Sequence, residues 1–304
     1  MKRTMGCVLI GAMLAGSYMA AEAADLSGAA RASLMPETSR TAYTAVAYRL
    51  RHIDGGDGLW SASVRRWGSM GDGKYHDAAS IVGVDRTLSA LSRAGIFLSY
   101  GSGEYAENGL ADRQKDYRLG LFYAEEKGAG SGFLYADYGW QRHKVRLTNT
   151  ARPDSHVWEA GGEYQYDLWH GRDDGWRLSP YINGAISRLS QDGYTAGNWQ
   201  VDASSNTYAA AETGIELRKK KDGTDYALRM GYKRVLTGNN PEFSGNHDGS
   251  AITGSGTMDT NYFTAALYGT APLYKDWKIG GDLYWEKGSR DDELALALMM
   301  SRVW

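Results

Sequence analysis

The chain has little of what disulfide-stabilised, nucleic-acid-binding or helical membrane proteins contain. It has a single cysteine, Cys7, so no disulfide can form within it, and its 5 prolines and 39 glycines follow no collagen-like repeat. The formal net charge is −2, which gives no basic footprint for a nucleic-acid partner. Beyond the N-terminus there is no run of about 20 apolar residues, which excludes a helical membrane protein. A transmembrane β-barrel is still compatible, because alternating strands have a soluble-looking average hydropathy.

The first residues have the pattern of a secretory signal. Lys2 and Arg3 precede an apolar run, and Ala21-Glu22-Ala23 is a small-residue cleavage site. We therefore predict a signal peptide over residues 1–23, export by the Sec route, and a mature chain without cysteine.

From Leu59 onward, apolar or aromatic residues alternate with small or polar ones, as in β-strands. In the segment 158–168, Trp158 and Tyr164 share one face, while Glu159 and Glu163 share the other. A water-soluble sandwich would bury the acids or expose the aromatic row to water. A barrel in lipid needs neither, since the aromatic face contacts hydrocarbon and the acidic face lines a polar lumen.

Twelve such segments can be counted, which predicts an all-β, antiparallel up-and-down transmembrane barrel of about 12 strands. Alternate connections are short, as periplasmic turns are, and the others are mostly longer. We expect loops at 69–75 and 104–113, and a mobile Gly- and Asn-rich outer loop at 237–259. The predicted strands span approximately 59–68, 76–87, 93–103, 114–125, 131–143, 155–168, 175–189, 206–219, 224–236, 260–271, 276–287 and 292–304.

The last strand has an apolar row that ends on an aromatic residue. Leu296, Leu298, Met300 and Trp304 share one parity, which predicts a lipid face with its terminal Trp in the interfacial aromatic girdle.

These residues resemble the autotransporter (type V secretion) C-terminal β-domain over roughly 43–304. The resemblance is carried by Gly83-Val84-Asp85, by the segment 158–164, by Leu178-Ser179-Pro180-Tyr181 and by the aromatic C-terminus. It implies a twelve-stranded barrel in the bacterial outer membrane, a helical linker that threads the lumen, and a C-terminal strand that the barrel-assembly machinery recognises through Leu296, Leu298, Met300 and Trp304.

The N-terminal region fits this organisation but departs from it in length. Residues 40–53 have helical spacing without Gly or Pro, so we expect a short linker at 24–39, a helical linker or plug at 40–57 and the barrel at 58–304. A helix outside the barrel is the alternative. Because 24–39 is too short to form a domain, we expect no large passenger in the same chain; any passenger would be a separate chain.

Charged residues of the inward parity are the candidate pore-lining set. Arg49 and Arg51 of the helix are expected to pair with Glu163, Glu212 or Glu216. The inward glutamates are expected to form a structural lumen wall by pairing with Arg229, Lys233, Lys278 or the helix arginines. The full candidate set is Arg49, Arg51, Glu159, Glu163, Glu212, Glu216, Arg229 and Lys233.

No catalytic, cofactor or metal site is predicted, since the six histidines show no metal-ligand spacing. His76, His143, His156 and His247 are expected to be solvated at the outer rim, and His247 with Asp248 is the nearest match to an omptin-type protease site. We therefore predict a non-enzymatic translocator barrel with outer-membrane lipid, lipopolysaccharide and the assembly machinery as partners. The alternatives are a small pore or channel, and a surface interaction protein that binds a host ligand through its outer loops.

Overall fold

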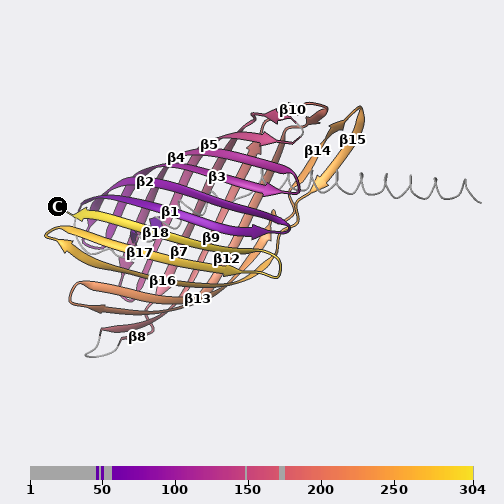
Figure 1. Cartoon of the computed structure of the whole chain (residues 1–304). Helices are drawn as coiled ribbons and strands as arrows, with labels where there is room; N and C mark the ends of the chain where they lie inside the picture. The colour runs from indigo at the N-terminus through magenta and orange to yellow at the C-terminus, as the bar shows by residue number, and fades with distance from the viewer. Residues whose placement is uncertain (1–45, 48, 51–56, 148, 171–174, 304) are drawn as a thin grey trace, which may run out of the picture.

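The structure is a computed structural model that describes residues 46–47, 49–50, 57–147, 149–170 and 175–303. Within these residues, twelve long strands form one closed antiparallel barrel with strongly tilted strands (Figure 1). The barrel strands are β1 (Gly58–Met70), β2 (Gly73–Ser89), β3 (Ser92–Glu107), β4 (Leu110–Lys127), β5 (Gly130–Arg146), β7 (Asp154–Tyr166), β9 (Trp176–Gln191), β12 (Ser204–Lys221), β13 (Thr224–Thr237), β16 (Asn261–Tyr274), β17 (Trp277–Lys287) and β18 (Asp292–Val303).

Each barrel strand pairs with the next one along the chain, and the first pairs with the last. The β1–β18 seam runs in register from Gly58 opposite Val303 to Ser69 opposite Asp292. The predicted number of strands and the up-and-down closure are therefore confirmed.

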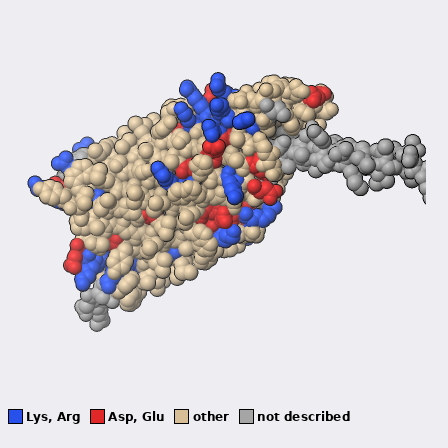
Figure 2. Space-filling model, in the orientation of Figure 1, with Lys and Arg blue, Asp and Glu red and all other residues tan. Residues whose placement is uncertain are grey.

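The two faces of the barrel differ as period-two alternation requires. In β7, the outward Trp158 is 42% exposed, whereas the inward Glu159 is 3% exposed. Figure 2 shows the result on the outer surface, where a broad uncharged belt separates charged side chains at the two ends. This belt has the character of a lipid-facing band.

At the end of the barrel that carries the C-terminus, most connections are two-residue turns, as expected. At the opposite end, the predicted loops at 69–75 and 104–113 are wrong. There β1–β2 and β3–β4 are long hairpins that turn through two residues each. Asn108 (φ 43°) and Gly109 (φ 93°) both have the left-handed backbone that a tight hairpin turn needs.

The two longest outer connections form a second sheet. It contains β10 (Tyr194–Ala196), β11 (Trp199–Val201), β14 (Glu242–His247) and β15 (Ser250–Ser255). The expected mobile loop at 237–259 is thus mostly a hairpin. Two further short strands, β6 (Thr150–Ala151) and β8 (Trp169–His170), pair with β5 and β9.

The small sheet is held against the barrel rim by a hydrophobic cluster. Tyr194, Trp199 and Phe243 from the sheet are buried with Tyr105 and Val145 from the rim. The sheet therefore packs on inward-facing residues at the outer end of the strands (Figure 1).

A second cluster lies toward the C-terminal end of the barrel. It combines inward side chains such as Trp60 and Phe122 with Val46, Ala47 and Leu50, which precede the barrel. These three residues and Arg49 have helical backbone and are buried; the rest of the expected 40–53 helix, and segments 1–23 and 24–39, lie outside the described residues. Among the residues described, no helix is long and apolar enough to cross a bilayer.

Candidate functional site in the barrel lumen

The inward faces of the strands place many ionisable side chains in the lumen. Glu159, Glu163, Glu216, Arg229 and Lys233 are all buried there. Burying a charge is costly unless it is paired and hydrogen-bonded, so the arrangement of partners decides what this lumen can do.

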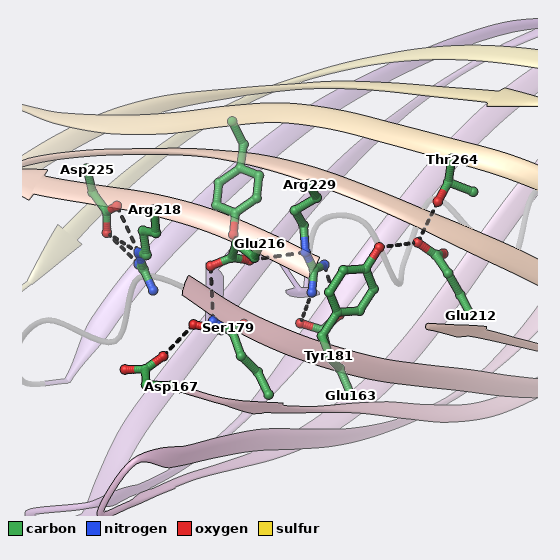
Figure 3. A network of polar contacts seen from close by, with 12 residues as sticks. Glu163, Asp167, Ser179, Tyr181, Glu212, Glu216, Arg218, Asp225, Arg229 and Thr264 are labelled. Atoms are coloured by element: carbon green, nitrogen blue, oxygen red, sulfur yellow. Dashed lines mark hydrogen bonds and ion pairs between the residues drawn. The ribbon is translucent and has the colours of Figure 1, made fainter. Parts of the chain in front are cut away.

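Arg229 of β13 is the centre of one such network (Figure 3). Its two terminal nitrogens donate to the two carboxylate oxygens of Glu163 on β7, at 3.0 and 2.9 Å. Its Nε lies 3.1 Å from Glu216 of β12. Gln165 donates to the other oxygen of Glu216 at 3.0 Å, and the hydroxyl of Tyr268 also donates to this carboxylate. One guanidinium thus joins two carboxylates from different strands.

Glu212 belongs to the same region but is held by hydroxyl groups. Tyr181 of β9 donates to Glu212 at 2.7 Å, and Thr264 of β16 donates to the same oxygen at 2.9 Å. The ring of Tyr181 lies beneath the guanidinium of Arg229, 3.6 Å from ring centroid to Cζ. This cation–π contact couples the two groups.

Glu159 lies in a separate network around Arg118. The guanidinium of Arg118 donates to Asp116 at 2.7 Å and to Asp137 at 3.2 Å. Glu159 accepts a hydrogen bond from the hydroxyl of Tyr135. Arg118 is a cation that the sequence prediction missed, whereas the expected pairing of inward glutamates with Arg229 is present at Glu163 and Glu216.

Lys233 is held near the outer end of the lumen. It pairs with Glu286 of β17, and its ammonium lies 4.0 Å from the centroid of the Tyr262 ring. The hydroxyl of Tyr284 donates to Glu286 at 2.6 Å.

Arg49, which precedes the barrel, ion-pairs with a barrel residue that the sequence prediction did not select. Its Nη2 lies 2.7 Å from Asp85 of β2, and Arg93 of β3 lies at the same distance from this carboxylate. The expected pairing of Arg49 with Glu163, Glu212 or Glu216 is therefore wrong, because these carboxylates are engaged by other barrel residues. Arg51 lies outside the described residues.

Two of the four outer histidines differ from expectation, whereas His76 and His156 are exposed as expected. His143 is not solvated, because its side chain is buried and its Nδ1 lies 2.7 Å from Asp112. The ring of His247 lies against Trp199 at 4.2 Å between ring centroids, tilted by 33°, and its Nε2 lies 3.7 Å from Asp248. In the part of the chain that the structure describes, no group of three His, Cys, Asp or Glu side chains is arranged to hold a metal ion.

The residues expected to form the assembly signal lie on the outward face of β18. Leu296, Leu298 and Met300 are exposed there, as a lipid-facing row must be. Trp304 lies outside the described residues.

This geometry can be compared with known proteins. The family model of the Autotransporter beta-domain matches residues 56–283. Among solved structures, the translocator domain of autotransporter NalP from Neisseria meningitidis is similar with a TM-score of 0.76 at 15% identity, and covers 93% of this chain and 99% of that one. The transport unit of the autotransporter AIDA-I from Escherichia coli is similar with a TM-score of 0.64 at 14% identity, and covers 88% and 99% respectively.

Curated relatives share the sequence more weakly. Esterase EstA from Pseudomonas aeruginosa is 22% identical over 258 residues, which cover 77% of this chain and 39% of that protein. Esterase EstA from Pseudomonas putida matches to the same extent. The chain thus spans about two fifths of the length of these relatives.

Proposed function

Because the chain belongs to the Autotransporter beta-domain family and is a translocator barrel of the bacterial outer membrane, we propose that it carries a polypeptide on its own N-terminal segment through its lumen and catalyses no reaction itself. The observation that carries this proposal is the buried Arg49. Its ion pair with Asp85 connects the chain that precedes the barrel to the lumen wall.

The surroundings of Arg49 support an occupied lumen. Val46, Ala47 and Leu50 are buried among inward apolar side chains of the strands. An unoccupied lumen would leave this apolar surface in contact with water, at a cost of about 25 cal/mol per Å². We propose that residues 40–57 form the linker in the lumen, and that residues 1–23 are the Sec signal peptide.

Surface display tests the proposed transport. A small reporter domain is inserted after residue 24, and external protease is added to intact cells that express the fusion. We expect the reporter to be cleaved from outside while the barrel migrates as a heat-modifiable outer-membrane protein. A reporter that stays protected in the periplasm, with the barrel correctly inserted, would refute transport.

A small pore is the alternative function, and the outer sheet and the wall-to-wall ion pairs argue against it. The same cells provide the test, because deletion of residues 24–54 removes Arg49 and its neighbours. If the segment occupies the lumen, the deleted barrel conducts more in planar bilayers than the full mature chain. Equal conductance would contradict an occupied lumen.

The name of the curated relatives suggests a cargo. They are called esterases, and the match leaves about three fifths of their length outside the shared region. We propose that an esterase domain is a suitable passenger for such a barrel. We further propose that the barrel-assembly machinery recognises β18 through Leu296, Leu298, Met300 and Trp304.

A further inference from the structure

Two adjoining hollows lie on the outward surface over β1 to β5 and the segments beside them, on the opposite side of the wall from the lumen. The hollow nearer the outer end is about 610 Å³ in volume and is strongly basic. Among the described residues that line it, the cationic ones are Arg65, Arg113, Lys115, Arg142, Lys144 and Arg152, against two carboxylates. Figure 2 shows Lys and Arg gathered at this end of the surface.

The two carboxylates neutralise little of this charge. Asp77 hydrogen-bonds to Arg66 of the inward face at 3.1 Å. Glu104 pairs with Arg113 at 3.2 Å, and the Arg113 side chain is still 67% exposed. Within the described part of the chain, no carboxylate lies within ion-pairing distance of Lys115 or Arg142. The basic hollow therefore carries an excess of positive charge, although Asp154 of β7 lies opposite Arg142 in the strand register.

The second hollow is about 670 Å³ in volume, and its walls are apolar. Its floor is formed by small side chains of β1 and β2, namely Ser61, Ser63 and Ser80. Leu298 and Met300 of β18 form one wall, and an aromatic row from β3 to β5 forms the other. The serines make the surface concave at a place where the neighbouring strands carry large residues.

Strand register places the two hollows next to each other. One row across the sheet contains Ser80, Tyr100, Tyr117 and Trp140, with ring centroids 5.1 Å apart for the two tyrosines and 5.7 Å apart for Tyr117 and Trp140. The next outward row, two residues farther along each strand, contains Lys115 opposite Arg142. Two residues advance a strand by about 6.8 Å, so the cations lie directly above the aromatic row.

Aromatic rows mark the boundary between hydrocarbon and headgroups, which places the cations at headgroup level and the apolar hollow at acyl-chain level. We propose that these hollows bind one lipopolysaccharide molecule of the outer leaflet, with its phosphates on the basic hollow and acyl chains in the apolar one. Guanidinium groups suit phosphate because they donate two parallel hydrogen bonds. The proposal rests on the outer-membrane placement of the barrel, with its termini at the periplasmic end.

The extent of the basic hollow favours this ligand over a phospholipid. Its cations span β1 to β5, which is four interstrand spacings, or about 19 Å. A phospholipid headgroup presents a single phosphodiester, whereas lipopolysaccharide carries several phosphates and more than two acyl chains. The separated phosphates of lipopolysaccharide match the basic hollow, and its acyl chains match the apolar hollow.

Titration of the folded mature chain in detergent with lipopolysaccharide tests the site. The variant K115Q/R142Q/K144Q should bind at least about tenfold more weakly, since each charge-assisted hydrogen bond is among the stronger ones. The matched control K127Q/K221Q/K275Q removes the same charge from exposed positions at or next to the turns of the opposite end and should bind like the parent protein. Ser63→Phe fills the apolar hollow and should also weaken binding, whereas Ala265→Phe, on the outward face of β16, should not.

Three results would overturn the proposal. The two triple variants could bind lipopolysaccharide with the same affinity, or the parent protein could bind dephosphorylated lipopolysaccharide as tightly as the intact molecule. In the third, phosphatidylglycerol vesicles would displace bound lipopolysaccharide as well as unlabelled lipopolysaccharide does. Heat-modifiable migration identifies variants that fail to fold, and Ser63→Phe then provides the second measurement. The surface-display experiment is independent of this one. If the reporter is not displayed but lipopolysaccharide binding still depends on the three cations, transport is refuted and the lipid site is supported.

Discussion

Replacing Arg229 with methionine should destabilise the barrel far more than replacing an exposed arginine. In the parent protein, this guanidinium joins Glu163 and Glu216, whose side chains are 3% and 0% exposed. Removing one partner of a buried ion pair costs about 3–5 kcal/mol, because a charge is left uncompensated. The control, Arg86→Met, affects a pair with Asp57 at 4.0 Å in which the arginine is 83% exposed, so about 0–1 kcal/mol is expected.

The assay is urea unfolding of the barrel in phospholipid vesicles, with the folded fraction read from heat-modifiable migration. The rescue variant R229M/E163Q/E216Q replaces both carboxylates with neutral amides, so it should lose less free energy of unfolding than Arg229→Met alone. If Arg229→Met costs no more than Arg86→Met, or if the rescue variant is the least stable, the electrostatic explanation of this network is refuted.

Two further predictions concern the strands and the outer loops. Gly83→Ala should lower the free energy of unfolding by about 1–3 kcal/mol, because the added Cβ would lie 2.3 Å from the Trp60 ring, whereas Gly281→Ala meets its nearest atom at 3.6 Å and should be neutral in the same assay. For Asp259, burial raises the carboxyl pKa, but hydrogen bonds from the Arg290 and Asp291 amides and the Ser289 hydroxyl outweigh it and hold the pKa below 3.8. The stabilising effect of Asp259 is therefore present above that pH and is lost as the pH falls below it. Protection of the Arg290 amide against hydrogen exchange, relative to its intrinsic rate at each pH, should accordingly decrease in acid. Asp259→Asn should remove this change in protection, and a change that persists in the variant would contradict the assignment.

The barrel could be predicted from the sequence because its signal is local. Each membrane-spanning segment alternates between lipid and lumen, and a few residues suffice to read that parity. The outer hairpins were missed because alternation fades once both faces are polar, as at Lys74 and Glu104, although the backbone ladder continues through both residues. The small outer sheet depends on contacts between two distant loops, which no local pattern records.

The sequence predicts which charged residues face the lumen, but it does not predict which of them form ion pairs with one another. The alternation of residues along each strand predicts that Glu163 and Arg229 face the lumen. Their contact, however, joins β7 to β13, which are not neighbours in the sheet. Which inward residues meet depends on the tilt and stagger of all the strands together. The same reason explains why Arg49 contacts Asp85, since the depth and rotation of the N-terminal segment in the lumen are set by the completed barrel.

The β1–β18 seam has a consequence for the order of events during assembly. Its partners, from Gly58 opposite Val303 onward, come from the beginning and the end of the barrel, so the strand that completes the ring is the last of the twelve barrel strands to be synthesised. Until then both edges expose unpaired amide and carbonyl groups, which hydrocarbon cannot satisfy. A barrel lacking β18 would therefore be an open sheet with two unpaired edges, and its closure must wait until β18 is available.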